Sequence, residues 1–253
     1  MMQLILTTHS THISAKMSLR NSVILYNDSN DKPNSHYILS GIDEKKEKST
    51  IHYLSKYIDA TKSRMFFARK IVFVEGISEQ LLVPVLFKNK YKKTFEKVGC
   101  NIINVNGVAF KHFLKIIKSG FFIKGLVLTD QDYGKKTEDR AEKLKNHFEK
   151  EGLIRIEISE ETTFEKDIIK ANKSGIGKSI LLNALKETKP ARGSDFEIEV
   201  GGNDLDTNSF FAEIEHCKSE FTFNLSSELE NLSQKDDFRI PTYIERGFQF
   251  IES

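Results

Sequence analysis

The chain has 253 residues, which allows one large domain or two small ones, and its 39% hydrophobic content is enough for a packed core. No uncharged apolar run approaches the roughly 18 residues of a membrane span, and the first residues do not have the pattern of a secretory signal. Two cysteines, Cys100 and Cys217, form neither a disulfide framework nor a CxxC metal site, so a cytoplasmic protein is predicted, and a net charge of +2 neither demands nor forbids a nucleic-acid partner.

The first 65 residues predict a small β-rich region followed by a helix. Residues 3–8 predict a short buried strand of the kind that normally lies inside a sheet. Residues 22–26 and 35–39 predict a hairpin around the polar turn 27–31. After a polar stretch, apolar side chains at helical spacing predict a helix that ends near residue 65. We place a domain boundary near residues 60–68.

After that boundary, apolar runs and amphipathic segments alternate regularly. The runs predict buried strands at 70–74, 101–105, 125–129 and 154–158. The segments between them predict helices at 78–87, 110–117 and 137–151. This alternation is typical of a parallel sheet with helices on both faces. Beyond residue 163 the pattern predicts less regular helices, a loop at 201–204 and a last short helix that Pro241 opens.

Acidic residues follow two of the predicted strands. Glu75 ends the first strand and Glu79 comes four residues later, so both carboxylates face the same side if a helix starts at once. Asp130 and Asp132 follow the third strand. Ligands of open α/β sheets bind at the carboxyl ends of the strands, and crowded carboxylates repel one another without a cation. Any one of these acids alone would more often be a solvated strand end, but together they predict a Mg²⁺ or Mn²⁺ site.

These motifs resemble those of the Toprim domain, and the flanking words resemble the OLD (overcoming lysogenization defect) family of ATP-dependent nucleases. Residues 66–76 resemble the OLD entry into Toprim, residues 162–168 its later acidic motif and residues 240–244 its C-terminal end. Residues 6–13 resemble the strand and His-switch loop that closes an ABC-type ATPase. The resemblance implies a Toprim-like α/β fold, with an ATPase fragment at 1–65 and a Toprim nuclease domain with a helical C-terminal extension at 66–253.

The resemblance also implies a two-metal endonuclease that hydrolyses DNA, in phage defence or DNA processing. Its two Mg²⁺ or Mn²⁺ ions would be held by a set of oxygen ligands: Glu75, Glu79, Asp130, Asp132 and Glu165, with Thr163 as a helper. Lys218 is the best match to the family's catalytic lysine, with Lys189 and Lys235 as alternatives. Glu75 matches the position in which Toprim enzymes place a general base.

An ATPase needs a phosphate-binding loop, and the sequence does not contain one before His9. Residues 173–179 resemble such a loop, but Asn172 stands where its first glycine belongs, so we predict a flexible turn before a helix at Ile180. We therefore expect no ATPase activity from the chain alone. His9 would sense a γ-phosphate only if upstream sequence or a partner ATPase chain supplied the rest of the site. The chain would be a fragment, a split subunit or the product of a shortened reading frame.

Partners other than an ATPase chain are also predicted. Eight lysines and one acid, Glu96, lie between residues 88 and 118, which predicts phosphate contacts with DNA, although such a stretch is commonly a solvated helical face. The resemblance also allows a homodimer. The alternative to a nuclease is a non-catalytic or partner-dependent remnant that binds DNA or regulates a partner.

Overall fold

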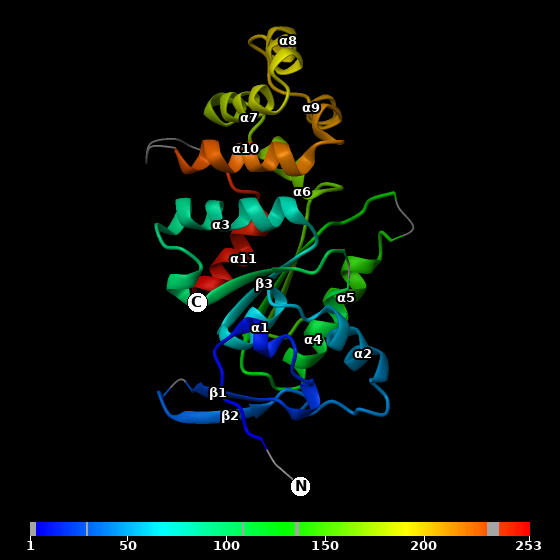
Figure 1. Cartoon of the computed structure of the whole chain (residues 1–253). Helices are drawn as coiled ribbons and strands as arrows, with labels where there is room; N and C mark the ends of the chain where they lie inside the picture. Colours follow the sequence, from blue (N-terminus) through cyan, green and yellow to red (C-terminus); the bar gives the residue numbers. More distant parts are fainter. Residues whose placement is uncertain (1–3, 29, 108, 135–136, 232–237) are drawn as a thin grey trace.

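A four-stranded parallel sheet lies at the centre of the computed structural model, which describes residues 4–28, 30–107, 109–134, 137–231 and 238–253 (Figure 1). Its strands follow one another in the order β4-β3-β5-β6. They are β3 (Lys70–Val74), β4 (Cys100–Asn104), β5 (Lys124–Thr129) and β6 (Ile154–Ile158). Each lies within one residue of a predicted strand, so the four apolar runs were interpreted correctly.

Helices cover both faces of this sheet (Figure 1). On one face, Val72 and Leu126 pack in the cluster that includes side chains of α3 (Ile77–Tyr91) and α11 (Thr242–Glu252). On the other face, Ile71, Phe73 and Val127 pack against α4 (Phe110–Lys118), and α5 (Arg140–Phe148) lies beside α4. Because side chains alternate between the faces of a strand, both faces of β3 are apolar and buried. The predicted α/β class is confirmed.

The strand order fixes where a ligand can approach. The chain passes from β3 through α3 to β4, and then returns through α4 on the opposite face to β5, on the other side of β3. The direction of winding therefore reverses between β3 and β5, which pair directly. Such a switch point leaves a crevice outside the carboxyl ends of the two strands. These two strands are the ones that the acidic residues follow.

A stack of helices extends outward from α3 (Figure 1). Helix α10 packs on α3, α7 packs on α10, and α8 packs on α7, while α6 packs on α9. The bounds are α6 (Phe164–Ala171), α7 (Gly175–Thr188), α8 (Pro190–Val200), α9 (Thr207–Ile214) and α10 (Lys218–Glu230). The sequence predicted helices here without resolving them, and the last helix, α11, begins directly after Pro241 as expected.

The predicted flexible turn at 173–179 is wrong, because α7 already begins at Gly175. Gly177 lies so close to Asn172 that a Cβ there would stand 2.5 Å from the Asn172 Oδ1 atom. The Lys178 ammonium donates to the carbonyl oxygens of Gly201 and Asn203, both at 2.6 Å. The lysine therefore binds the loop after α8.

The N-terminal region contains the predicted hairpin. Strands β1 (Val23–Asn27) and β2 (Pro33–Tyr37) pair in antiparallel register. The helices of this region are α1 (Thr11–Ser14), η1 (Leu19–Asn21), α2 (Lys48–Tyr57) and η2 (Lys62–Phe67). One more 3-10 helix, η3 (Glu96–Val98), lies between α3 and β4. Leu19, Ile51 and Leu54 join the same apolar cluster as Phe113 of α4, so this region packs against one face of the sheet.

The strand predicted at residues 3–8 is wrong for the described residues 4–8. They form no strand, and Leu4 and Ile5 are 82% and 80% exposed. A strand needs a neighbour to pair with, and in the described part of the chain β1 and β2 pair only with each other. Among the described residues no helix has both the length and the hydrophobicity that crossing a bilayer requires.

Candidate active site

Glu75 and Glu79 lie together at the carboxyl end of β3. Glu75 follows Val74, Gly76 is the N-cap, and α3 starts at Ile77, so Glu79 falls in its first turn. A Cβ at position 76 would stand 3.1 Å from the Glu79 Oε2 atom, so any larger residue there would push the Glu79 carboxylate aside. Helix α3 thus starts two residues after Glu75, which is the condition under which the two carboxylates were expected to face the same side.

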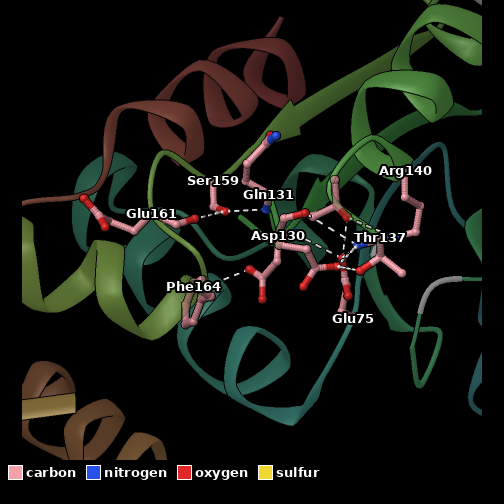
Figure 2. Close-up of polar contacts among 10 residues, drawn as sticks. Glu75, Asp130, Gln131, Thr137, Arg140, Ser159, Glu161 and Phe164 are labelled. Carbon is pink, nitrogen blue, oxygen red and sulfur yellow. Dashed lines mark hydrogen bonds and ion pairs between the residues drawn. The ribbon is translucent and has the colours of Figure 1, made fainter. Parts of the chain in front are cut away.

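Asp130 follows β5 and connects the two strand ends. Its backbone N–H donates to the Glu75 Oε1 atom at 3.1 Å, and the Thr129 hydroxyl donates to the same oxygen (Figure 2). Its own Oδ1 atom accepts a hydrogen bond from the Phe164 N–H at 2.9 Å. Two residues on, Asp132 adopts a left-handed backbone with φ of 58°, which is uncommon for a residue other than glycine.

The N-terminus of α6 and the first residue of α10 complete this edge. Thr163 is the N-cap of α6, and its hydroxyl accepts from the Lys166 N–H at 3.4 Å. Glu165 is buried in the first turn, and its Oε2 atom lies 3.3 Å from the Lys218 Nζ atom. The same ammonium stands 4.8 Å from the centre of the Phe211 ring, a cation–π distance. The lysine proposed from sequence is thus adjacent to an acid proposed from sequence.

The two alternative lysines have different positions. The Lys189 ammonium donates to the backbone carbonyl of Glu213, in the outer helical stack. Lys235 lies outside the described residues. Of the two candidate lysines that the structure describes, Lys218 is the one that lies beside an acid of this edge.

Arg140, the first residue of α5, was not singled out from the sequence. One of its terminal nitrogens, Nη2, lies 3.0 Å from the Glu75 Oε1 atom and 3.2 Å from the Asp132 Oδ2 atom (Figure 2). The other, Nη1, donates to the Thr129 hydroxyl at 3.3 Å. The guanidinium therefore bridges the acids that follow β3 and β5.

Ser159 and Asp167 form hydrogen bonds with the backbone of the loops that follow β5 and β6. The Ser159 hydroxyl accepts from the Gln131 N–H at 2.8 Å and donates to the Glu161 carbonyl at 2.7 Å (Figure 2). The carboxylate of Asp167 accepts from the backbone N–H groups of Glu160 and Glu161, at 3.1 to 3.2 Å. Ser159 follows a predicted strand without any spacing that marks it, whereas Asp167 lies within the 162–168 motif but was not predicted to be a site residue.

Residues 66–132 match a family model described as "Overcoming lysogenization defect protein-like, TOPRIM domain". This part of the chain is thus similar to the Toprim domain of OLD-like proteins. The chain is also 30% identical over 143 residues to the protein "Endonuclease GajA" of Bacillus cereus (strain HuB5-5), in an alignment that covers 51% of this chain and 20% of that relative. The chain thus spans about a fifth of the length of the curated relative that it matches.

Solved structures resemble the chain over a larger part of its length. The C-terminal region of the Burkholderia pseudomallei OLD protein is 19% identical with a TM-score of 0.53, and the match covers 74% of this chain and 98% of that one. The C-terminal region of the Xanthomonas campestris pv. campestris OLD protein is 18% identical, also at 0.53, and the match covers 74% and 94%. At these identities the likeness establishes the fold.

Two carboxylates of this edge, Glu79 and Asp130, have raised pKa values. Burial is the main cause for Glu79, whose pKa rises to about 7, and the charges of Glu165 and Glu75 add to it. Burial also raises the pKa of Asp130 well above its usual value, with the charges of Glu79, Glu75 and Glu165 acting in the same direction. Four acids are therefore close enough to repel one another in an environment that disfavours their charge.

The chemistry of these donors fits a hard divalent cation. Carboxylate oxygens are the ligands that Mg²⁺ and Mn²⁺ prefer, and a cation would offset the repulsion that adds to the effect of burial on the pKa values. Within the described residues, no three or more His, Cys, Asp or Glu side chains are gathered closely enough to hold an ion as they stand. Two of the expected ligands, Glu75 and Asp132, are held instead in ion pairs with Arg140.

Two other expectations concern residues that lie away from this edge. His9 is exposed, and its ring stands 6.3 Å from that of Phe67, which precedes β3 at the amino end of the sheet. The structure therefore does not bring His9 to the carboxylates. The first five lysines of the lysine-rich stretch lie in the last turn of α3 and beyond it, and helix α3 runs away from the acidic edge.

Several lysines of that stretch are engaged within the chain. Lys93 pairs with Glu252 at 2.7 Å, and Lys118 donates to the His147 carbonyl at 2.5 Å. Lys90 pairs with Glu245 as well. This placement favours the solvated-face interpretation over the predicted phosphate contacts for this part of the stretch.

The raised pKa of Glu79 predicts how the stability of the metal-free protein depends on pH. Its pKa is 4.5 when unfolded and about 7 when folded, so the folded state binds this proton more tightly. The stabilisation is fully present below pH 4.5 and is lost as the pH rises through about 7; it amounts to about 3 kcal/mol for this group. Urea unfolding in EDTA should show this loss between pH 4.5 and 8 in the wild type.

Glu79→Gln is the matched comparison, because glutamine keeps the shape of the side chain and does not titrate. The difference in unfolding free energy between variant and wild type should grow in favour of the variant as the pH rises over that range. Parallel pH profiles for the two proteins would contradict the assignment of the raised pKa to Glu79.

Proposed function

We propose that this chain forms the nuclease part of an OLD-type protein and hydrolyses phosphodiester bonds in DNA with the help of divalent metal ions. The observation that carries the proposal is the convergence of Glu75, Glu79, Asp130 and Glu165, with Lys218, at the carboxyl edge of a Toprim sheet. The 30% identity to an endonuclease over 143 residues supports the same chemistry.

The metal would be held by the carboxylates of this edge, namely Glu75, Glu79, Asp130, Asp132 and Glu165, with the Thr163 hydroxyl beside them. Two bound Mg²⁺ or Mn²⁺ ions would supply an activated water and would offset charge on the attacking and leaving oxygens. Thr163 is also the N-cap of α6, so a ligand role would share its oxygen with the Lys166 N–H.

The side chains of the chain itself have separate tasks in this proposal. Glu75 is fixed by hydrogen bonds from Thr129, Asp130 and Arg140 to one carboxylate oxygen, which orients the group as a ligand or a general base. Lys218 is held between Glu165 and the Phe211 ring, where its positive charge can stabilise the charge that develops on the leaving oxygen.

DNA contacts are proposed on the α6 and α10 side of the edge. Lys166 and Lys218 approach the Phe211 ring, with ammonium-to-centroid distances of 4.9 and 4.8 Å. These charges lie beside Glu165, so a phosphate that binds them would be placed next to the acidic edge. Electrostatic contacts with phosphates make such binding sensitive to salt.

The wider setting is also part of the proposal. We propose a cytoplasmic protein that acts in phage defence or DNA processing and depends on an ATPase region or chain for regulation. The exposed apolar side chains of Leu4, Ile5 and Leu6 support a protein partner for the N-terminal region, because exposed apolar groups in one segment favour association. His9 lies in the same segment, where such a partner could complete a nucleotide site. A homodimer fits the same proposal.

Incubation of supercoiled plasmid with the protein in Mg²⁺, Mn²⁺ or EDTA tests the nuclease proposal. Relaxed or linear DNA should form with metal and not with EDTA. Glu75→Gln should remove this activity, because it removes the charge of a ligand at the centre of the edge. Glu96→Gln, an exposed glutamate beyond the far end of α3, is the matched control and should cleave like the wild type.

Other results would count against the proposal. Cleavage that persists in EDTA, or that survives Glu75→Gln, would point to a contaminating nuclease. A folded, monodisperse wild type that cleaves nothing in either metal would exclude nuclease activity by this chain alone. The partner-dependent alternative would then be examined with an added ATPase chain.

A further inference from the structure

Arg140 is the one cation that the structure shows in contact with two of the proposed ligands, Glu75 and Asp132, in the described part of the chain. All three side chains are largely buried, at 18%, 17% and 13% exposure. A single nitrogen, Nη2, faces both carboxylates. Removal of these charges from water without a partner would be costly, and the guanidinium supplies the compensating charge.

The arginine is incompletely satisfied in this position. Its Nε atom is buried without a hydrogen-bond partner. Nη2 reaches the Asp130 carbonyl only at 3.5 Å and Nη1 reaches the Thr129 hydroxyl at 3.3 Å, both long for hydrogen bonds. The strongest arginine–carboxylate pairs are bidentate, with two guanidinium nitrogens on one carboxylate. The Arg140 guanidinium instead uses one nitrogen for two carboxylates.

The bridge also uses oxygens that a metal ion would need. Glu75 Oε1 and Asp132 Oδ2 accept from Arg140, and the Thr137 hydroxyl donates to the same Asp132 oxygen at 3.1 Å. Glu79, Asp130 and Glu165 form the other part of the edge, where they interact with one another rather than with Arg140. Within the described residues, Arg140 thus neutralises the Glu75 and Asp132 part of the edge, while in the other part Lys218 pairs with Glu165.

We propose that Arg140 is an internal counter-ion that holds Glu75 and Asp132 in the metal-free protein and competes with a divalent ion for them. When an ion binds to these two carboxylates, the guanidinium leaves them. This inference rests on the proposed function, because it assumes that the edge binds metal. It adds that the affinity for one of the ions is lowered by a residue of the same chain.

Calorimetric titration with Mn²⁺ tests the competition directly. Arg140→Gln removes the charge and should bind one Mn²⁺ ion at least about tenfold more tightly than the wild type. Lys143→Gln is the matched control, since it removes one positive charge from the same helix at a side chain that is 77% exposed and pairs with Asp139. Its affinity should stay within about twofold of the wild type. Arg140→Lys keeps the charge and should fall between.

Thermal melting gives a second readout that needs no catalysis. In EDTA, Arg140→Gln should melt several degrees below Lys143→Gln, because Glu75 and Asp132 lose their counter-ion. In excess Mn²⁺ the difference should disappear, because the ion replaces the missing charge. If the metal-free Arg140→Gln protein is too unstable for titration, Arg140→Lys provides both measurements.

The outcomes separate this inference from the proposed function. Mn²⁺ binding that Glu75→Gln abolishes, but that Arg140→Gln leaves unchanged or weakens, would keep the metal site and overturn the competition. A melting difference that persists in Mn²⁺ would also overturn it, because Arg140 would then be a structural ion pair. A wild type and an Arg140→Gln variant that both fail to bind Mn²⁺ would overturn the metal site itself and the competition with it.

Discussion

Asp130→Asn is expected to abolish metal-dependent DNA cleavage, by at least about a thousandfold, while it stabilises the metal-free protein at pH 8. The two effects have one cause. Asp130 is buried among Glu79, Glu75 and Glu165, and both burial and their charges raise its pKa well above the usual value. A neutral side chain of the same shape removes both the cost of burying a charge and the repulsion by the neighbouring acids. The same change also removes a metal ligand.

The geometry around Asp130 makes the substitution conservative in every respect but charge. Its Oδ1 atom accepts from the Phe164 N–H at 2.9 Å, and the amide oxygen of asparagine can accept that bond as well. We therefore expect the variant to be more stable than the wild type in EDTA and to melt at a higher temperature, because it no longer buries a charge among like charges. Plasmid cleavage and melting in EDTA are the two measurements.

Asp139→Asn provides the control for this variant. Asp139 is the N-cap of α5, its side chain is 80% exposed, and asparagine is an equally good N-cap residue. This variant should cleave DNA and melt like the wild type. An Asp130→Asn protein that retains cleavage would remove Asp130 from the site, and one that melts below the wild type in EDTA would contradict its burial among like charges.

The acidic edge was predictable from sequence because strands set the position of residues that follow them. Glu75 and Asp130 each follow a run of buried β-branched or apolar residues, and parallel strands end at the same edge. That the two strands are adjacent depends on the order β4-β3-β5-β6, which no local pattern specifies. The resemblance to a known family, rather than spacing, singled out Glu165 and Lys218.

Arg140 could not be found in the same way. It lies in a charged stretch between Thr137 and Glu151, where helical periodicity alone does not decide which charge turns inward. The signal that could have indicated it is its place at the start of the helix that follows the Asp130–Asp132 motif, because the first turn of that helix returns to the sheet edge. A rule that searches for such a cation beside paired acids would have included it.

The strand expected at residues 3–8 shows the opposite error. Its apolar composition is typical of a buried strand, but a strand is stable only with a neighbour to pair with. Within the described residues β1 and β2 use each other, so Leu4 and Ile5 stay exposed. The local sequence indicates which side chains a segment would bury as a strand. Whether another strand is available to pair with it depends on the rest of the fold.

Lys218→Met is expected to lower the rate of DNA cleavage about a hundredfold without weakening Mn²⁺ binding. Its ammonium lies 3.3 Å from Glu165, a proposed ligand, so removal of the charge makes that carboxylate a better partner for a cation. A loss of cleavage with equal or tighter Mn²⁺ binding would therefore separate stabilisation of the leaving oxygen from metal binding. Plasmid cleavage rates and Mn²⁺ titration together make this distinction.

The same substitution at the alternative lysines decides between the three candidates. Lys189 donates to the Glu213 carbonyl, so Lys189→Met should cleave within about twofold of the wild type once its folding is confirmed. Lys235→Met, outside the described residues, completes the comparison. A hundredfold loss in either of these variants, with cleavage retained in Lys218→Met, would move the catalytic charge away from α10. The Phe211 ring beside Lys218 would then serve packing and DNA contact alone, because cation–π contact positions a charge without itself taking part in the reaction.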